Sequence, residues 1–301
     1  VTQELAFDPY RMNMTSLNVM PADMSTSSIF GELDLLLVKN DNSDYYVPDY
    51  GVDQIGSVSN DEGYKVFING ADGQTLSVTG APLSGGGTTL QAYRMNALPY
   101  VLQDCMATDD VFAGFEDNLL IVKSDDSDYF VPSFGVQTLD EMCPGEAYAV
   151  FLNGGDDIDF SYPTGGALSS SHSDHFVEDY ILSTRTNDVA LTGESHLILL
   201  TQIDGRVEMG DQLRAYANGL LVGSINIVEE HLNGTHPVDL AAVGSVDMSN
   251  YGGPVLEGYS SGDMIELRLW SVDRGVELKV DAELSDIQYG NVMELSTGSA
   301  T

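Results

Sequence analysis

The residues best suited to chemistry in this sequence are acidic side chains gathered in three short turns. Carboxylate and amide oxygens in clusters are the ligands that Ca²⁺ prefers in proteins, so calcium is the candidate ion at these turns. None of the turns has the glycine and closing glutamate of an EF-hand loop. The alternative is an Asx turn, in which Asp and Asn oxygens accept hydrogen bonds from nearby backbone N–H groups. The candidate calcium ligands are Asp41, Asn42, Asp44, Asp125, Asp126, Asp128, Asp156, Asp157 and Asp159.

Few other groups point to a reaction. Two imidazoles and a carboxylate lie close together in His172-Ser173-Asp174-His175 and could bind zinc; a solvated linker is the alternative. The sequence has no P-loop, no dinucleotide-binding glycine pattern and no CxxC pair. Carboxylate pairs such as glycoside hydrolases use are no evidence for that activity, because any acidic protein supplies them. We therefore expect a protein that is not an enzyme and carries no organic cofactor.

The charge balance excludes whole classes of partner. The 301 residues include 47 Asp and Glu but 11 Lys and Arg, which gives a formal net charge of −36. Such a chain repels phosphates, and this argues against nucleic acid and anionic membranes as partners. No apolar run approaches the roughly 18–20 residues of a membrane helix, so we expect no membrane insertion. With 43% hydrophobic residues the chain can nevertheless bury large cores.

An internal repeat organises the first half of the chain. Twelve of the eighteen residues at 35–52 are identical at 119–136, and the match resumes between 62–70 and 146–154. Self-similarity of this kind predicts two tandem modules. The expected organisation is a first β repeat with an N-terminal strand at 1–83, a second β repeat at 88–168, a flexible linker at 169–178 and a C-terminal β-sandwich at 179–301.

Each repeat has the pattern of short β-strands. The apolar run Leu35–Lys39, an Asx-rich turn and residues 45–48 predict a hairpin. Tyr64–Ile68 alternates as a strand does and ends at Asn69-Gly70, a strong turn dipeptide. Residues 75–79 also alternate between polar and apolar side chains. The short helices expected in the two repeats are residues 25–30 and 107–112.

The two cysteines occur together in one repeat. Cys105 and Cys143 belong to the second copy, and the equivalent positions in the first copy are approximately Ala22 and Ser59. Joint replacement is what two residues in contact would show, so we expect a disulfide, with two buried thiols as the alternative. A disulfide indicates an oxidising compartment. A first residue Val1 in place of Met fits a processed product, so we expect secretion.

The C-terminal third has longer strands separated by frequent turn signals. This spacing predicts an Ig-like antiparallel β-sandwich and makes the whole chain all-β. Asn218-Gly219 marks the clearest hairpin. Trp270 lies within a strand of alternating apolar residues, so we expect it in the core. The expected strands are residues 195–201, 212–216, 220–227, 264–270 and 276–282.

Three stretches resemble parts of secreted bacterial proteins. Gly210-Asp211-Gln212-Leu213-Arg214-Ala215-Tyr216, with Leu220-Leu221-Val222-Gly223, looks like a hairpin of β-sandwich modules in large secreted and cell-surface proteins of bacteria, many of them marine. Glu257-Gly258-Tyr259 with Leu267-Arg268-Leu269-Trp270 resembles a later part of that module. Glu62-Gly63-Tyr64-Lys65-Val66 resembles the short repeats that often precede it. The resemblance implies an extracellular appendage, adhesion or sorting role and transfers no catalytic residue.

These observations predict an extracellular structural protein whose copies self-assemble into a filament, tube or surface layer. Strands or loops docking between copies would build the polymer, and Ca²⁺ between acidic faces would screen their repulsion. The N-terminal segment alternates loosely and is the candidate donor strand; a strand of its own module is the alternative. The segment consists of Val1, Thr2, Gln3, Glu4, Leu5, Ala6 and Phe7.

The alternative function is binding, as an adhesin in cell adhesion or as a carbohydrate-binding module with surface glycans as partners. Tyrosine-rich loops with Tyr45, Tyr46 and Tyr50 would form the binding face. A binder should stay monomeric in calcium and retain affinity for a glycan, whereas a lattice subunit should grow into particles. A viral fibre or capsid protein belongs to the structural class and is not separated from it by sequence.

Overall fold

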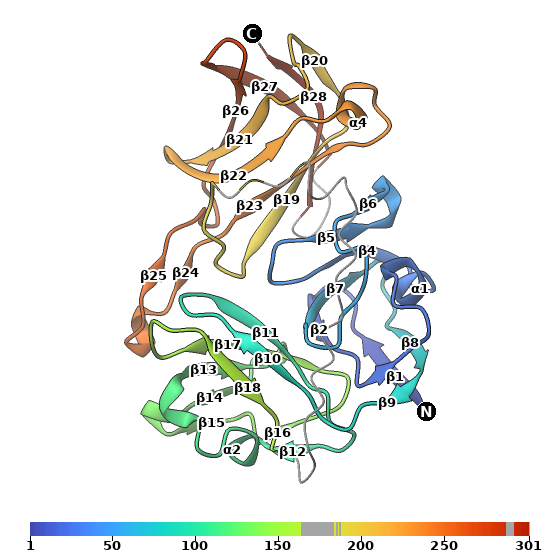
Figure 1. The fold of residues 1–301 in the computed structure, drawn as a ribbon, viewed down its shortest axis with the longest axis vertical. Helices are drawn as coiled ribbons and strands as arrows, with labels where there is room; N and C mark the ends of the chain where they lie inside the picture. Colours follow the sequence, from blue (N-terminus) through green and yellow to red (C-terminus); the bar gives the residue numbers. More distant parts are fainter. Residues whose placement is uncertain (164–183, 185, 187, 287–291, 301) are drawn as a thin grey trace. The chain divides into compact units, whose positions relative to one another are not determined.

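The fold is built almost entirely of short β-strands, as the sequence predicts. The computed structural model describes residues 1–163, 184, 186, 188–286 and 292–300 (Figure 1). Most strand pairs are antiparallel and the described helices are short, which confirms the all-β class. Within these residues no helix is long and apolar enough to cross a membrane. The expected linker at 169–178, with His172, Asp174 and His175, lies outside the described residues.

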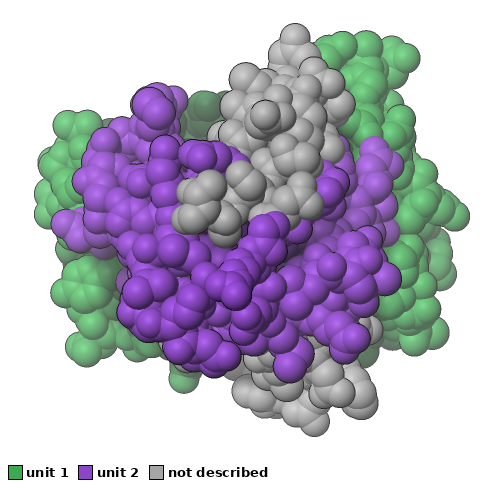
Figure 2. Space-filling model, turned by 90° about the horizontal axis from the view of Figure 1, so that it is seen from above, with its two compact units in different colours: residues 1–41, 55–176, 247–255 green, residues 42–54, 177–246, 256–301 purple. Residues whose placement is uncertain are grey.

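Two compact units share the chain, and their segments alternate along the sequence (Figure 2). Unit 1 consists of residues 1–41, 55–176 and 247–255, whereas unit 2 consists of residues 42–54, 177–246 and 256–301. A hairpin of the first repeat is therefore part of unit 2. A short segment from the C-terminal third is likewise part of unit 1.

The first repeat centres on strand β7, which pairs antiparallel with β2 and β4. A bulge between Leu35 and Leu37 shifts the register of β4 against β7. Strands β5 and β6 pair with each other in the hairpin that belongs to unit 2. The elements are β1 (Thr2–Phe7), β2 (Asn13–Thr15), β3 (Val19–Met20), α1 (Thr26–Phe30), β4 (Leu35–Lys39), β5 (Tyr45–Val47), η1 (Pro48–Tyr50), β6 (Val52–Asp53), β7 (Tyr64–Ile68), β8 (Gln74–Thr79) and β9 (Ala81–Pro82).

The second repeat reproduces this arrangement within unit 1. Its sheet has the strand order β11-β17-β13-β14-β15, and an equivalent bulge lies between Leu119 and Ile121. Aromatic rings such as Phe112 and Phe130, stacked 6.1 Å apart, fill its core. The elements are β10 (Gly87–Leu90), β11 (Met95–Pro99), β12 (Met106–Ala107), α2 (Thr108–Val111), η2 (Glu116–Asn118), β13 (Leu119–Lys123), β14 (Tyr129–Val131), η3 (Pro132–Phe134), β15 (Val136–Gln137), β16 (Glu141–Met142), β17 (Ala147–Leu152) and β18 (Ile158–Ser161).

The large sheet of unit 2 curls around one apolar core. Its order is β22-β21-β26-β27-β28-β19-β23, and the two end strands meet, since a Cβ on Gly223 would lie 2.4 Å from the Ala241 carbonyl oxygen. Strand β28 pairs in parallel with β19 and β20. The elements of the C-terminal third are β19 (Ser195–Leu200), β20 (Ile203–Gly205), β21 (Gln212–Ala217), β22 (Leu220–Asn226), α4 (Glu229–Leu232), β23 (Val238–Val243), β24 (Val246–Asp247), η4 (Ser249–Tyr251), β25 (Val255–Leu256), β26 (Ile265–Ser271), β27 (Val276–Asp286) and β28 (Val292–Ala300).

The expected core position of Trp270 is wrong. Leu267 and Leu269 of β26 are buried in the core of unit 2, and side chains alternate between the two faces of a strand. Trp270 therefore lies on the opposite face and is half-buried. There the Arg214 guanidinium carbon lies 5.1 Å from the centre of its ring, a cation–π contact.

Candidate functional site

The acidic turn of the first repeat contacts the first strand of the second repeat. The Asp41 carboxylate accepts a hydrogen bond from Arg94 Nη2 at 2.9 Å and another from the Ala97 backbone N–H at 2.8 Å. Both partners lie in unit 1: Arg94 directly precedes β11, and Ala97 is its middle residue. The side chain of Arg94 is 6% exposed and that of Asp41 is 19% exposed, so water screens this ion pair little.

An equivalent contact runs in the other direction, from the acidic turn of the second repeat to the first repeat. The Asp125 carboxylate accepts a hydrogen bond from the Met14 backbone N–H at 2.7 Å, and Arg11 Nη2 lies 3.2 Å from it. Arg11 also donates to Asp126. Asp125 and Arg11 occupy the positions equivalent to Asp41 and Arg94. We call these two reciprocal contacts the repeat clasp.

The two halves of the repeat clasp differ in exposure. The side chains of Arg11 and Asp125 are 29% and 23% exposed, and that of Asp126 is 68% exposed. Burial raises the pKa of Asp125, although the Met14 N–H and the charge of Arg11 oppose the shift. The Asp41–Arg94 half is the drier one, so we expect it to contribute more to the stability of unit 1.

The remaining acidic candidates do not form one cluster. Asp157 accepts a hydrogen bond from the Ala92 N–H at 2.8 Å, and Asp159 accepts one from the Thr89 hydroxyl at 2.8 Å. Asp128 closes its own turn, with its backbone N–H 3.2 Å from the Ser124 hydroxyl. Asp156 is exposed. Asn42 and Asp44 line a pocket of unit 2.

Across the described residues, one group of three His, Cys, Asp or Glu side chains has its ligand atoms within 4.8 Å of one another. The group is Cys105, Glu141 and Cys143. Its two sulfur atoms are joined in a disulfide that links residues 38 positions apart, so neither is a thiolate that could bind a metal. This disulfide is the one that the joint replacement of the two cysteines predicts.

The N-terminal segment pairs within its own repeat. Strand β1 lies antiparallel to β8, with Leu5 opposite Leu76, and the Val1 ammonium donates to the Gly80 carbonyl at 2.8 Å. Gln3, Leu5 and Phe7 are buried, while the residues between them are exposed. The segment is thus a strand of its own module, which is the alternative that the sequence left open beside the donor strand. Donating it to another copy would first require it to leave β8.

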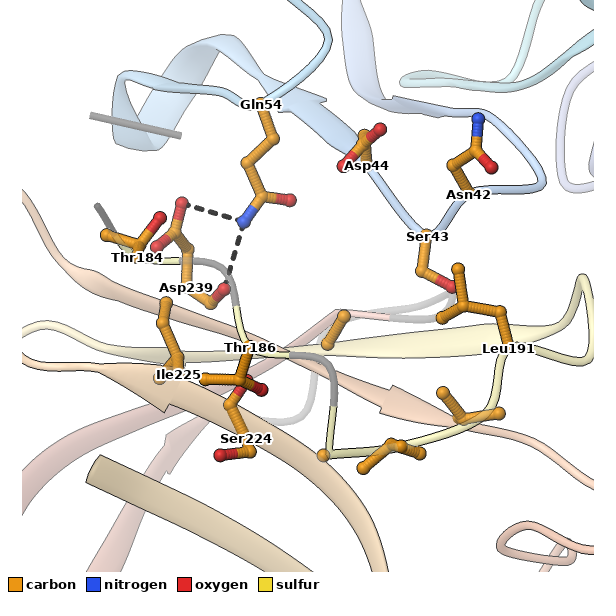
Figure 3. A pocket seen from close by; sticks show the side chains of 14 residues that line it. Asn42, Ser43, Asp44, Gln54, Thr184, Thr186, Leu191, Ser224, Ile225 and Asp239 are labelled. Atoms are coloured by element: carbon orange, nitrogen blue, oxygen red, sulfur yellow. Dashed lines mark hydrogen bonds between the residues drawn. The ribbon is translucent and has the colours of Figure 1, made fainter. Parts of the chain in front are cut away.

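A pocket of about 390 Å³ lies within unit 2 (Figure 3). It is lined by residues 42–44 and Gln54, which flank the β5–β6 hairpin, by Thr184, Thr186, Val189 and Leu191, and by strands β22 and β23. Gln54 forms one part of its wall and is held by both ends of its amide. Its Nε2 donates to the Asp239 carbonyl and to Asp239 Oδ2, each at 3.0 Å, and its Oε1 accepts from the Tyr45 N–H at 3.1 Å. Tyr45 is itself anchored, with its hydroxyl 2.8 Å from Ser195 Oγ. The wall is therefore rigid.

A serine hydroxyl of this pocket has no visible protein partner. Ser43 is 7% exposed, and its Oγ makes no hydrogen bond to any described residue. Its backbone has φ +66°, which is uncommon for a residue with a Cβ. The hydroxyl points toward the side of the pocket that holds Leu191 (Figure 3). The alignment of the two repeats draws attention to this position, because both repeats have serine there, Ser43 and Ser127. Ser127 is exposed. The acidic residues alone do not single out this position.

A second pocket of about 360 Å³ in unit 2 is lined by part of a serine-containing motif. This motif is not among the candidate sites predicted from the sequence. Gly258-Tyr259-Ser260-Ser261-Gly262 has the spacing G-x-S-x-G of many serine hydrolases. The structure gives both glycines a backbone role: a Cβ on Gly258 would lie 2.3 Å from the Gly244 carbonyl carbon, and Gly262 has φ +93°. The motif lies in the loop from β25 to β26, whereas the hydrolase motif joins a strand to a helix.

A buried histidine lies close to the pocket wall. His231 of α4 accepts a hydrogen bond at Nδ1 from the Val228 N–H at 3.2 Å, so its proton is on Nε2, 3.9 Å from Asp239 Oδ1. Burial, together with the neighbouring His236, lowers the pKa of His231 to about 4. The imidazole is therefore neutral at pH 7.

This shift makes unit 2 sensitive to acid. The unfolded chain protonates His231 near its ordinary pKa of about 6.5, whereas the folded chain does so only near pH 4. Between these values the unfolded state binds more protons, so stability is complete above about pH 6.5 and falls by roughly 3 kcal/mol as the pH drops through the window. Urea unfolding followed by the fluorescence of Trp270, the single tryptophan, should show a smaller loss in His231→Gln. Equal pH dependence in both proteins would contradict the assignment.

Comparison with known proteins adds no relative. No protein-family model, curated protein or solved structure matches this chain. The class that the fold defines is thus an all-β protein of two interleaved units, in which a duplicated module is joined by the repeat clasp.

Proposed function

We propose that this protein is an extracellular structural protein whose copies assemble through the exposed hairpin of the second repeat. The supporting observation is a difference between two equivalent hairpins. In the first repeat, Val52 of the β5–β6 hairpin is fully buried, and its equivalent in the second repeat is Val136. In the second repeat, Val136 of the β14–β15 hairpin is 42% exposed and the neighbouring Phe134 is 59% exposed.

The position of β15 favours docking. It is the last strand of its sheet and both of its residues are exposed. An edge strand offers backbone N–H and C=O groups to another chain, and the apolar side chains beside it add surface to bury. The occupant that we propose is a different surface of a second copy of this chain, because a heterologous contact that does not close on itself propagates into a polymer.

Compartment and calcium enter this proposal through two further features. The Cys105–Cys143 disulfide supports an oxidising, extracellular setting. The net charge of −36 opposes association of copies, and Ca²⁺ bound between exposed carboxylates such as Asp126 and Asp156 would screen it. A binding role is the alternative function, and the pocket of unit 2 is the observation that favours it.

The test compares assembly of two variants that add the same charge. Phe134→Glu with Val136→Glu places two carboxylates on the hairpin, and Met209→Glu with Met264→Glu places two on other exposed apolar side chains, which are 72% and 86% exposed. We expect negative-stain electron microscopy and sedimentation to show regular polymers for the parent and the methionine variant and dispersed particles for the hairpin variant.

Calcium is tested in the same experiment by adding a chelator. Polymers that dissolve with the chelator support cation bridging, and polymers in both conditions remove calcium from the proposal. Monomers of the parent protein in every condition would overturn self-assembly. Polymers of the hairpin variant would overturn the role of β14–β15.

A further inference from the structure

We infer that the pocket of unit 2 binds a small neutral carbohydrate of one or two rings. The inference starts from Ser43, whose buried Oγ has no hydrogen-bond partner among the described residues. Leaving a buried hydroxyl without a hydrogen bond costs free energy, and such groups in native proteins call for an explanation. A ligand hydroxyl in the pocket would supply the missing partner.

The size of the pocket fits a small ligand. Its volume of about 390 Å³ lies at the lower end of the roughly 300–1,000 Å³ that small-molecule sites occupy. The wall is preformed, because Gln54 is fixed by Asp239 and by the Tyr45 backbone. A rigid wall lowers the entropy lost on binding.

The described polar lining favours hydroxyl groups over charged acids. The described part of the lining contains carboxylates, amides and hydroxyls but no Lys, Arg or His, so these described residues offer no cation to a phosphate, sulfate or uronic acid. A carboxylate accepts several hydrogen bonds and donates none when ionised, which suits the many O–H donors of a sugar. The polar lining residues are Asn42, Ser43, Asp44, Gln54, Thr184, Thr186, Ser224 and Asp239.

The apolar lining supplies the other half of such a site. Leu191, Ile225 and Val243 give an aliphatic surface against which the C–H groups of a sugar ring can pack. No aromatic side chain lies among the described lining residues, so a flat nucleobase would find no ring to stack on. The combination of aliphatic surface and convergent oxygen atoms matches a pyranose better than a purely apolar ligand.

A metal ion fits the same oxygens less well. Calcium takes about 6–8 oxygen ligands at about 2.3–2.6 Å, which requires carboxylates to converge on one point. Across the described residues, no group of three metal-binding side chains includes Asp44 or Asp239. The carbohydrate inference stands apart from self-assembly, since it concerns a pocket of unit 2 and the proposed docking hairpin belongs to unit 1.

The test is saturation-transfer NMR on the full chain with neutral sugars as probes. The probes are the methyl glycosides of glucose, galactose and mannose, with maltose as a two-ring probe. Glucuronate and glucosamine are the charged comparators, and CaCl₂, which has no protons to observe, is titrated by isothermal calorimetry. We expect at least one neutral probe to bind with a millimolar dissociation constant. Glucuronate should not bind.

Three variants locate the site. Ser43→Ala should weaken binding about fivefold, as loss of one hydrogen bond does, whereas Ser127→Ala changes the equivalent exposed serine of the second repeat, at φ +70°, and should leave binding unchanged. Leu191→Trp fills the pocket from a side chain that is 38% exposed and should abolish binding. Its folding is checked by thermal unfolding.

Two results would overturn the inference. The first is binding of glucosamine or calcium with no binding of any neutral sugar, or no binding at all. The second is sugar binding that survives Leu191→Trp in a folded protein, because the ligand would then lie elsewhere. Polymer formation by Ser43→Ala and Leu191→Trp, measured alongside, distinguishes failure of this inference from failure of the assembly proposal.

Discussion

Asp41→Ala is expected to lower the free energy of unfolding of unit 1 by about 3–5 kcal/mol. The substitution removes the carboxylate that Arg94 contacts at 2.9 Å and leaves a guanidinium that is 6% exposed without this partner. It also removes the acceptor of the Ala97 N–H. Differential scanning calorimetry of both proteins measures the loss.

A matched control and a double variant make this prediction specific. Asp126 belongs to the other half of the repeat clasp and its side chain is 68% exposed, so Asp126→Ala should cost about 1 kcal/mol or less. Replacing Arg94 by Met together with Asp41→Ala removes the buried charge as well and should cost less than Asp41→Ala alone. Equal losses for Asp41→Ala and Asp126→Ala would refute a buried clasp.

The disulfide is expected to contribute almost as much. It joins residues 38 positions apart, and replacing both Cys105 and Cys143 by serine should lower the free energy of unfolding by about 4 kcal/mol in the chain-entropy model. The reduced parent protein is the control, since it lacks the same bond but keeps both sulfur atoms. Guanidinium unfolding should give similar midpoints for the reduced parent and the double variant, both well below the oxidised parent. An unchanged midpoint would show that the crosslink does not restrain the unfolded chain.

Local pattern was enough to predict most strands. The bounds expected for Leu35–Lys39 and Tyr64–Ile68 are those observed for β4 and β7, because alternation and turn residues act within a few positions. The side of β26 on which Trp270 lies was predicted wrongly, although the turns before and after this strand were predicted. Leu267 and Leu269 face the core, whereas Glu266 and Arg268 share the opposite face with Trp270, so these charged residues already marked the phase of β26 in the sequence.

Long-range pairing was beyond the sequence. Parallel pairing of β19 with β28 joins segments whose local patterns also fit antiparallel partners. The acidic turns were correctly seen as special, but the contacts of Asp41 with Arg94 and of Asp125 with Arg11 depend on how two repeats meet. The sequence predicts a calcium ligand or an Asx turn for these aspartates, whereas the observed ion pairs depend on arginines of the other repeat.

The membership of residues 42–54 in unit 2 has a consequence for synthesis of the chain. These residues leave the ribosome with the first repeat, long before residues 177–246 exist. Domains generally fold in order from the N-terminus during translation, yet this hairpin must wait for its partners in unit 2, because Tyr45 contacts Ser195 and Gln54 contacts Asp239. Residues 1–41 and 55–176 of unit 1 can close early, but its segment 247–255 also arrives late, so both units are complete only near the end of translation. A fragment that begins after residue 176 would lack one wall of its own pocket.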